Sequence, residues 1–350
     1  MVYRVSLVVA FAGMILVALS TAPLGASQEA GAAAVDVRME TDEADAALAI
    51  LHAHRAGEPV AEEAWGRLFE SEGYRRLQQR ERSMGREFQD SAFQEFLLSD
   101  PVVASAPALA EAVADWRQAD LTGAAGRALA YLPAGTKLRA TLYPAIKPRP
   151  NSFVFEVESD PAIFIHLDPT VPRAKLENTL AHELHHIGYA AACGAADSEL
   201  TDRVRTAVRW AGAFGEGLAM LAAAGGPSVH PHAASSAEER ARWDRDVANV
   251  EADLRRVEMF LLDVAEGRLS DPDAVRAAAM EFFGVQGPWY TVGWKMAVTI
   301  EEAFGRERLI EVMCDPRRLM ATYNAAAQER NRAGGDLPLW SSSLLALLDP

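Results

Sequence analysis

The stretch LENTLAHELHHIGYAAAC, residues 176–193, decides how the rest of the chain is interpreted. Its apolar residues recur at helical spacing, Pro172 stands where a helix can begin, and Gly194 stands where it can end. We therefore expect one long helix here. His182-Glu183-Leu184-His185-His186 lies near the middle of that helix, so several groups that bind metals or carry protons share one rigid element.

Short runs rich in β-branched and aromatic residues precede this helix and predict three strands, at residues 137–143, 152–157 and 162–167. Helical patterns dominate elsewhere. They cover residues 42–54, 62–98 and 108–131 before the strands, and 199–224, 237–265, 273–283, 289–304, 306–313 and 317–330 after the histidine-rich helix. The predicted fold class is α+β, predominantly α-helical, with a small sheet preceding the histidine-rich helix.

The N-terminus has the pattern of a secretory signal peptide, which we assign to residues 1–27. Arg4 precedes an apolar run from Val5 to Leu19, and Pro23 and small residues follow. That run is shorter than the roughly 20 residues of a membrane-spanning helix, although an uncleaved anchor is the alternative. We expect a secreted or periplasmic protein with no stable membrane span after cleavage, a helical N-terminal subdomain over residues 28–135 and a catalytic region over 136–350.

Composition restricts the possible partners and metal sites. The chain has 350 residues, 50% of them hydrophobic, and its 49 acidic against 34 basic residues give a formal charge of −15. Such a field repels polyanions, so we expect no nucleic-acid partner. Cys193 and Cys314 are the only cysteines, which excludes a four-cysteine metal site and leaves open whether the two form a disulfide. Any metal must be bound by histidines and carboxylates.

His182 and His186 have the spacing of two ligands to one metal ion. On a helix they lie about 40° apart on one face, with a rise of about 6 Å. Two neutral imidazoles suit Zn²⁺, which in catalytic sites usually has three protein ligands and one water. Glu183 lies about 100° round the helix from His182, where its carboxylate can reach such a water without replacing it. We predict one zinc ion, with His182 and His186 as ligands and Glu183 as the general base.

The third ligand that the sequence favours is Glu216, in AGAFGEGLAML. Small residues share its predicted helical face, so this helix can approach the histidine-rich helix closely. The residues of that face are Gly212, Ala213, Ala219, Met220 and Ala223. The competing acids are Asp197, Glu199 and Asp202, which lie nearer in the sequence. His185 lies about 60° round the helix from His182, on the side opposite Glu183. We expect it to pack or hydrogen-bond with a neighbouring element rather than bind the ion, and the alternative is that it faces the substrate.

HELHH followed by a helix bearing EGLAM resembles the glutamate-liganded zincins (gluzincins), and in particular the uncharacterised bacterial domain families of zinc-dependent peptidases. Trp65–Tyr74 (WGRLFESEGY) and Pro288–Phe304 (PWYTVGWKMAVTIEEAF) also look like family segments. The resemblance implies a zincin-like catalytic core and hydrolysis of peptides by a metal-bound water. In better-known members of the clan, a carboxylate a few residues after the third ligand supports a histidine. Ala219 and Met220 stand at those positions here, which leaves that supporting group unassigned.

Peptide hydrolysis also needs a hydrogen-bond donor for the oxyanion, and Tyr290 is the leading candidate, with packing in a helix as the alternative. The function that we expect is an exported zinc-dependent peptidase acting on peptide or protein substrates. The alternatives are a catalytically silent zinc-binding protein and a zinc amidase acting on a non-peptide envelope substrate. Substrate specificity and oligomeric state are not encoded in any recognisable pattern.

Overall fold

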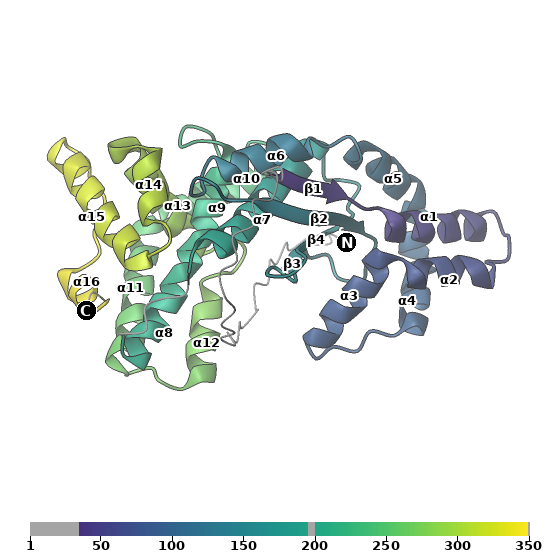
Figure 1. The fold of residues 1–350 in the computed structure, drawn as a ribbon, viewed down its shortest axis with the longest axis horizontal. Coiled ribbons are helices and arrows are strands. Elements are labelled where there is room, and N and C mark those ends of the chain that lie inside the picture. The colour runs from purple at the N-terminus through teal and green to yellow at the C-terminus, as the bar shows by residue number, and fades with distance from the viewer. Residues whose placement is uncertain (1–34, 195–199, 349–350) are drawn as a thin grey trace, which may run out of the picture. The chain divides into compact units, whose positions relative to one another are not determined.

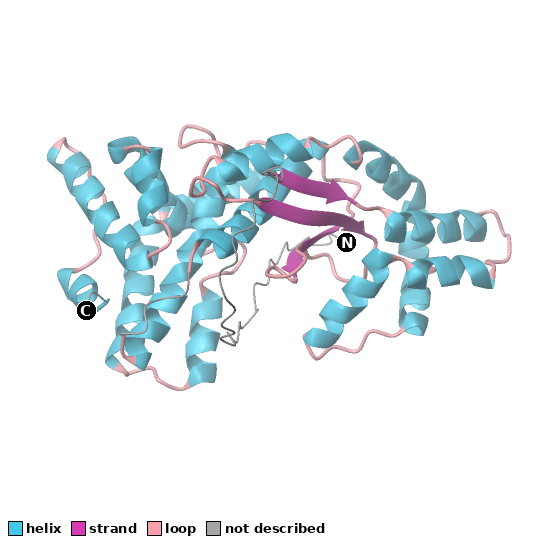
Figure 2. Cartoon of the chain, viewed as in Figure 1, coloured by secondary structure: helices cyan, strands magenta, loops and turns pink. Residues whose placement is uncertain are grey.

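The computed structural model describes residues 35–194 and 200–348. The signal peptide assigned to residues 1–27 and the two competing acids Asp197 and Glu199 lie outside this range. The described chain is mostly helical with one small sheet, as the magenta strands among cyan helices show in Figure 2, which confirms the predicted fold class.

The sheet has four strands in the order β1-β2-β4-β3. The strands are β1 (Val35–Met39), β2 (Leu138–Ala145), β3 (Phe153–Phe155) and β4 (Ala162–His166). β2 pairs in parallel with β1 and β4, and β3 runs antiparallel to β4 (Figure 1). β2, β3 and β4 correspond to the three predicted strands. β1 is additional, and its partner β2 begins about a hundred residues later.

The chain divides into two compact units, and both are discontinuous in sequence. The sheet unit comprises the chain up to Arg117 together with Lys137–Pro169, and the helical unit comprises Gln118–Thr136 and the chain from Thr170 onward. The chain passes from one unit to the other three times. The domain border expected between residues 135 and 136 lies next to one of these passages, the one after Thr136.

Aromatic side chains from the strands stack in a core of the sheet unit. Tyr143 and Phe153 each stack on Phe164, with ring centroids 5.0 Å and 5.1 Å apart. Leu77 joins this core from a helix. The helices of this unit are α1 (Asp42–Arg55), α2 (Glu62–Glu70), α3 (Glu72–Ser83), α4 (Asp90–Leu97) and α5 (Asp100–Trp116).

The helical unit contains every residue of the candidate site. Its helices are α6 (Leu121–Leu129), α7 (Arg173–Ala192), α8 (Asp202–Ala211), η1 (Gly212–Phe214), α9 (Gly215–Ala224), α10 (Ala237–Ala248), α11 (Val250–Glu266), α12 (Pro272–Glu281), α13 (Pro288–Phe304), α14 (Arg306–Val312), α15 (Pro316–Arg332) and α16 (Ser342–Leu348). α9 packs against both α7 and α13 (Figure 1).

The histidine-rich helix forms as predicted. Pro172 is its N-cap residue and α7 ends at Ala192. In contrast, the single helix expected over residues 199–224 is divided into α8, the 3₁₀ turn η1 and α9. The interruption coincides with Gly212 and Gly215, residues of low helix propensity.

Among the described residues, no single helix is long and apolar enough to cross a membrane. α4 and α5 reach that length and composition only as a pair, and the two are bent by 74° relative to each other.

Candidate metal centre and catalytic site

The middle of α7 brings two imidazoles together. The Nε2 atoms of His182 and His186 lie 3.0 Å apart, as their spacing of one helical turn allows. Both side chains are almost completely buried, at 8% and 10% exposure. The two predicted histidine ligands therefore present their nitrogen atoms to the same small volume.

Glu216 approaches this volume from α9. Its Oε2 atom lies 3.2 Å from Nε2 of His182 and 3.1 Å from Nε2 of His186. The break at η1 starts a new helix at Gly215, which places Glu216 in its first turn. Further along, the Asn178 amide of α7 donates to the carbonyl oxygen of Ala223 at 3.0 Å, which joins the other end of α9 to α7.

The small-residue face predicted around Glu216 is only partly involved in this approach. Ala219, Met220 and Ala223 are buried in α9, whereas Gly212 and Ala213 belong to η1 and are only half-buried. The closeness of α9 to α7 therefore depends on the part of the face that follows Glu216.

The charges of Glu216 and the two imidazoles are complementary. Burial would raise the pKa of Glu216, but the His186 charge and the hydrogen bonds with both imidazoles hold it well below its usual range. Conversely, burial by itself would lower the pKa of His186. The charge of the Glu216 carboxylate and its hydrogen bond have the larger effect and raise the pKa of that imidazole. The carboxylate and the imidazole thus each favour the charged form of the other.

The donor set is suitable for zinc. One ligand atom from each of His182, His186 and Glu216 lies within 4.8 Å of the others, and these residues form a cluster that can hold a metal ion. Two imidazole nitrogens and one carboxylate oxygen, with a position left for water, are the ligands of a catalytic zinc. The competing acid Asp202 is 95% exposed and pairs with Arg205 at 3.0 Å, so it contributes nothing to this cluster.

Glu183 lies beside the cluster and is itself buried, with 1% exposure. Neither carboxylate oxygen has a hydrogen-bond partner among the described residues. Burial raises the pKa of Glu183, and the charges of His182 and His186 oppose this increase. A buried carboxyl group without a partner is costly to maintain, so its position next to the cluster requires a functional explanation.

Tyr290 of α13 completes the group. Its ring stacks on His182 with centroids 6.3 Å apart and an interplanar angle of 13°. Burial raises its pKa well above 10, and the charges of Glu216 and Glu183 and a hydrogen bond with Glu216 act in the same direction. The phenol therefore stays protonated and can donate a hydrogen bond. The ring is also buried, at 4% exposure, and contacts Phe283 with centroids 6.5 Å apart, so packing stays an alternative role for this residue.

Two glycines bring α9 and α13 into direct backbone contact, a feature that the sequence interpretation missed. A Cβ atom on Gly217 would lie 2.0 Å from the backbone nitrogen of Trp294, and one on Gly293 would lie 2.6 Å from the carbonyl oxygen of Phe214. Gly217 follows Glu216 directly and Gly293 lies one turn after Tyr290, so this contact fixes their separation. Gly217 and Gly293 are the only sign of this contact that the sequence offered.

His185 ties α7 to the segment that follows α6. It is fully buried, and its Nε2 atom donates to the carbonyl oxygen of Tyr131 at 3.3 Å. Burial, with the charges of His186 and His182, lowers its pKa to about 3, so the imidazole is neutral. The Tyr131 hydroxyl in turn donates to Glu301 of α13 at 3.1 Å. His185 thus has the packing and hydrogen-bonding role expected for it and lies outside the ligand set.

A disulfide between Cys193 and Cys314 anchors the C-terminal end of α7. The two Cα atoms are 5.1 Å apart, and the Tyr189 hydroxyl donates to the carbonyl oxygen of Met313 at 3.0 Å beside the disulfide. The pairing that the sequence left open is therefore present. It fixes the residues after His186 to the loop before α15.

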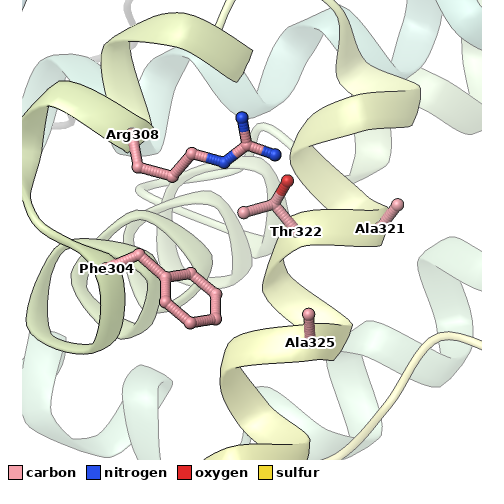
Figure 3. Close-up of a pocket in the computed structure, with 5 residues that line it drawn as sticks. All are labelled: Phe304, Arg308, Ala321, Thr322 and Ala325. Atoms are coloured by element: carbon pink, nitrogen blue, oxygen red, sulfur yellow. The ribbon is translucent and has the colours of Figure 1, made fainter.

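One hollow of the helical unit lies away from this cluster. It has a volume of about 590 Å³, and α13, α14 and α15 line it through Phe304, Arg308, Ala321, Thr322 and Ala325 (Figure 3). None of these side chains belongs to the metal cluster, so this hollow is not part of the candidate site.

One family model matches the chain, over residues 65–332, which is more than half of its length. The family is described as "Putative zinc dependent peptidase (DUF5700)". The chain belongs to this family. No curated protein and no solved structure matches it significantly. The matched range includes the metal cluster, Tyr290 and both flanking segments, Trp65–Tyr74 and Pro288–Phe304, for which the sequence resemblance was noted. It supports zinc-dependent peptidase chemistry at the level of the family.

Proposed function

We propose that this protein is an exported zinc-dependent peptidase of the glutamate-liganded zincin type. His182, His186 and Glu216 would hold one zinc ion, and Glu183 would act as the general base. The observation that carries the proposal is the buried Glu183 carboxyl group, which has no partner among the described residues and lies beside the cluster that can hold a metal. A site used only to bind zinc would not require such a group.

Zinc bound by two neutral imidazoles and one carboxylate supplies a Lewis acid that lowers the pKa of a coordinated water to about 7 and polarises a substrate carbonyl. The role of the three ligands is to hold that centre in a fixed position. Their burial, the contact of Asn178 with Ala223 and the backbone contact at Gly217 support this rigidity.

Glu183 moves the proton in the proposed reaction. Its carboxylate accepts a proton from the attacking water as the oxygen adds to the carbonyl carbon of the peptide. It then gives this proton to the amide nitrogen while the carbon–nitrogen bond breaks, which leaves a carboxylic acid and an amine. The raised pKa of Glu183 favours this role because a more basic carboxylate accepts the proton more readily.

Tyr290 would provide the hydrogen bond to the oxyanion. Its raised pKa keeps the hydroxyl protonated, and the Glu216 carboxylate contributes to that increase. In the proposed reaction the hydroxyl turns toward the negative charge that develops on the carbonyl oxygen. Before that, the same hydroxyl would orient the ligand carboxylate of Glu216, which is a supporting role that the sequence left unassigned.

The substrate and location remain part of the same proposal. A peptide or protein is the expected substrate, and residues 1–27 support export to the periplasm or the exterior. The formal charge of −15 disfavours nucleic acid as a partner.

The test compares the purified zinc-loaded chain with its Glu183→Gln variant on a peptide library. We expect hydrolysis to fall by about 10³-fold or more, because the base is lost, while zinc content stays near one ion per chain. Glu177→Gln is the matched control: it changes a carboxyl group on the same helix, at a position that accepts a hydrogen bond from the backbone of Asp120. Its activity should be close to that of the wild type.

Equal hydrolysis by the wild type and Glu183→Gln would remove Glu183 as the base. A wild-type chain that binds zinc but cleaves no peptide would point instead to the zinc-binding or amidase alternatives. Absence of zinc from the wild type would contradict the whole proposal.

A further inference from the structure

The sheet unit contains a pocket that the proposed peptidase reaction does not use. It has a volume of about 160 Å³ and lies beside the residues that follow β2. Leu77, Phe88 and Phe93 provide apolar walls, and Lys147 and Arg149 provide the basic ones. This volume is below the roughly 300 Å³ at which pockets begin to accept drug-sized ligands, so the pocket suits a group about the size of one amino-acid residue.

The position of the pocket is one typical of ligand sites. β1, β2 and β4 are parallel, and Lys147 stands two residues beyond the carboxyl end of β2, the strand between the other two. Ligands of open sheets with parallel strands characteristically bind just outside the carboxyl ends of the strands.

Lys147 orders residues 148–151, which contribute to one wall of the pocket. Its side chain is buried, with 3% residue exposure, and its Nζ atom donates to the carbonyl oxygens of Arg149 and Asn151 and to the side chain of Asn151. Pro148 and Pro150 further restrict this turn. The backbone on both sides of Arg149 is therefore fixed before any ligand arrives.

Arg149 itself is free to bind. Its exposed side chain forms no ion pair and no hydrogen bond among the described residues. Burial lowers the pKa of Lys147 to about 7. The charges of Glu81 and Glu43 oppose this decrease, and the charges of Arg80 and Arg149 add to it. Positive charges thus repel one another at this wall, and an anion placed between them would relieve the repulsion.

The acidic residues of the pocket leave an excess of positive charge. Glu81 is already neutralised, because it pairs with Arg80 at 2.6 Å and with Arg86 at 3.1 Å. Glu87 is the remaining acid of the lining and is exposed. The lining itself has two bases, Lys147 and Arg149, and two acids, and one of these acids is neutralised by Arg80 and Arg86 from outside the lining.

We propose that this pocket binds a carboxylate attached to a small apolar body, with Arg149 pairing with the carboxylate and Leu77, Phe88 and Phe93 contacting the body. A C-terminal residue of a peptide and a free acylated amino acid both carry this chemistry. An arginine on a pre-ordered turn favours such binding because little conformational entropy is lost on pairing and its guanidinium matches a carboxylate.

The test is calorimetric titration of the zinc-loaded full chain with N-acetyl-leucine, and with N-acetyl-leucinamide as the uncharged counterpart. We expect the acid to bind at least about tenfold more tightly than the amide, and Arg149→Gln to remove this preference. Glu87→Gln should tighten binding of the acid by about threefold, because it removes the unpaired negative charge. Arg82→Gln, an exposed arginine of α3 outside the pocket lining, is the matched control and should leave binding unchanged.

The peptide Gly-Gly-Leu, titrated into the Glu183→Gln chain so that it is not consumed, distinguishes the two sources. Tighter binding than N-acetyl-leucine indicates a peptide terminus, and equal binding indicates that only the last residue is recognised. The proposal is overturned if the acid and the amide bind equally, if no binding is detected, or if carboxylate binding survives in Arg149→Gln. The same titration of the zinc-free chain excludes capture of the carboxylate by zinc in the helical unit, since binding at the proposed pocket should persist there.

Discussion

Each unit of the molecule buries a glutamate among cationic or ionisable side chains, yet the two glutamates differ in their partners and in the direction of their pKa shifts. In the sheet unit, the carboxylate of Glu81 has two guanidinium partners, Arg80 and Arg86, and they lower its pKa although burial opposes this. In the helical unit, Glu183 has no partner among the described residues, and burial raises its pKa.

The difference separates a structural charge from one available for chemistry. A paired, buried ion contributes little net stability but cannot lose its partner without a large cost. An unpaired, buried carboxyl group lowers stability by itself and is retained where a reaction or a ligand uses it. Both glutamates are buried, so burial does not distinguish them. The difference is that Glu81 has ion-pair partners and Glu183 has none among the described residues.

The largest expected effect comes from the backbone contact that holds the helical unit together around its cluster. Gly217→Ala places a methyl group 2.0 Å from the Trp294 nitrogen, so α9 and α13 must separate. We expect a loss of about 3 kcal/mol of unfolding free energy, and zinc affinity lower by at least about tenfold because Glu216 is the preceding residue. Urea unfolding measures the change in unfolding free energy, and competition with a zinc chelator measures the change in zinc affinity.

Gly215→Ala is the matched control for that substitution. It lies two residues earlier on the same helix, and a Cβ atom there would meet nothing within 4 Å. It should retain zinc affinity and gain up to about 1 kcal/mol of stability, since alanine is the better helix former. If both variants behave alike, the close approach of the two helices does not position Glu216.

The matched pair of substitutions Glu81→Gln and Glu183→Gln tests the comparison itself. Glu81→Gln leaves the buried Arg80 without its carboxylate, and we expect it to cost about 3 kcal/mol of unfolding free energy. Glu183→Gln removes a carboxyl group that has no partner and should change stability by less than about 1 kcal/mol or increase it. Denaturant unfolding of the zinc-free chains checks both, and equal destabilisation would show that Glu183 is structurally paired after all.

A third buried carboxyl group gives a smaller effect that depends on pH. Burial raises the pKa of Glu43 to about 8, although the Ile146 amide donates to it at 3.1 Å. The folded chain therefore binds more protons than the unfolded chain between about pH 4.5 and pH 8. The stability that this group contributes is fully present below about pH 4.5 and is lost as the pH rises through about 8.

The variant Glu43→Gln has no such proton to lose. Relative to it, the wild type should lose stability by about 2 kcal/mol from pH 6 to pH 8, as thermal unfolding at a series of pH values would show. Parallel pH profiles for the two chains would mean that Glu43 titrates with an ordinary pKa.

The sequence predicted what local patterns can encode. The helix from Arg173 to Ala192 follows from periodicity, and the strands after residue 136 follow from runs of β-branched and aromatic residues. The proximity of His182 to His186 follows from helix geometry alone. Glu216 was favoured because small residues accompany it, and the structure brings it to the two histidines.

The sequence could not predict contacts between distant segments. The strand Val35–Met39 is short, and it becomes a strand by pairing with β2 about a hundred residues later. The contact between Gly217 and Gly293 depends on how two helices cross, and the partner of His185 is a backbone carbonyl in another segment. None of these leaves a periodic pattern, because each depends on packing in three dimensions.

X-ray absorption of the zinc-loaded chain tests the central claim most directly, since it reports the atoms bound to the metal. We predict two imidazole nitrogens at about 2.0 Å, additional oxygen ligands and no sulfur, with one imidazole lost in His186→Ala and an oxygen ligand altered in Glu216→Ala. A spectrum that is unchanged in either variant, or a wild-type chain that binds no zinc, would contradict the account.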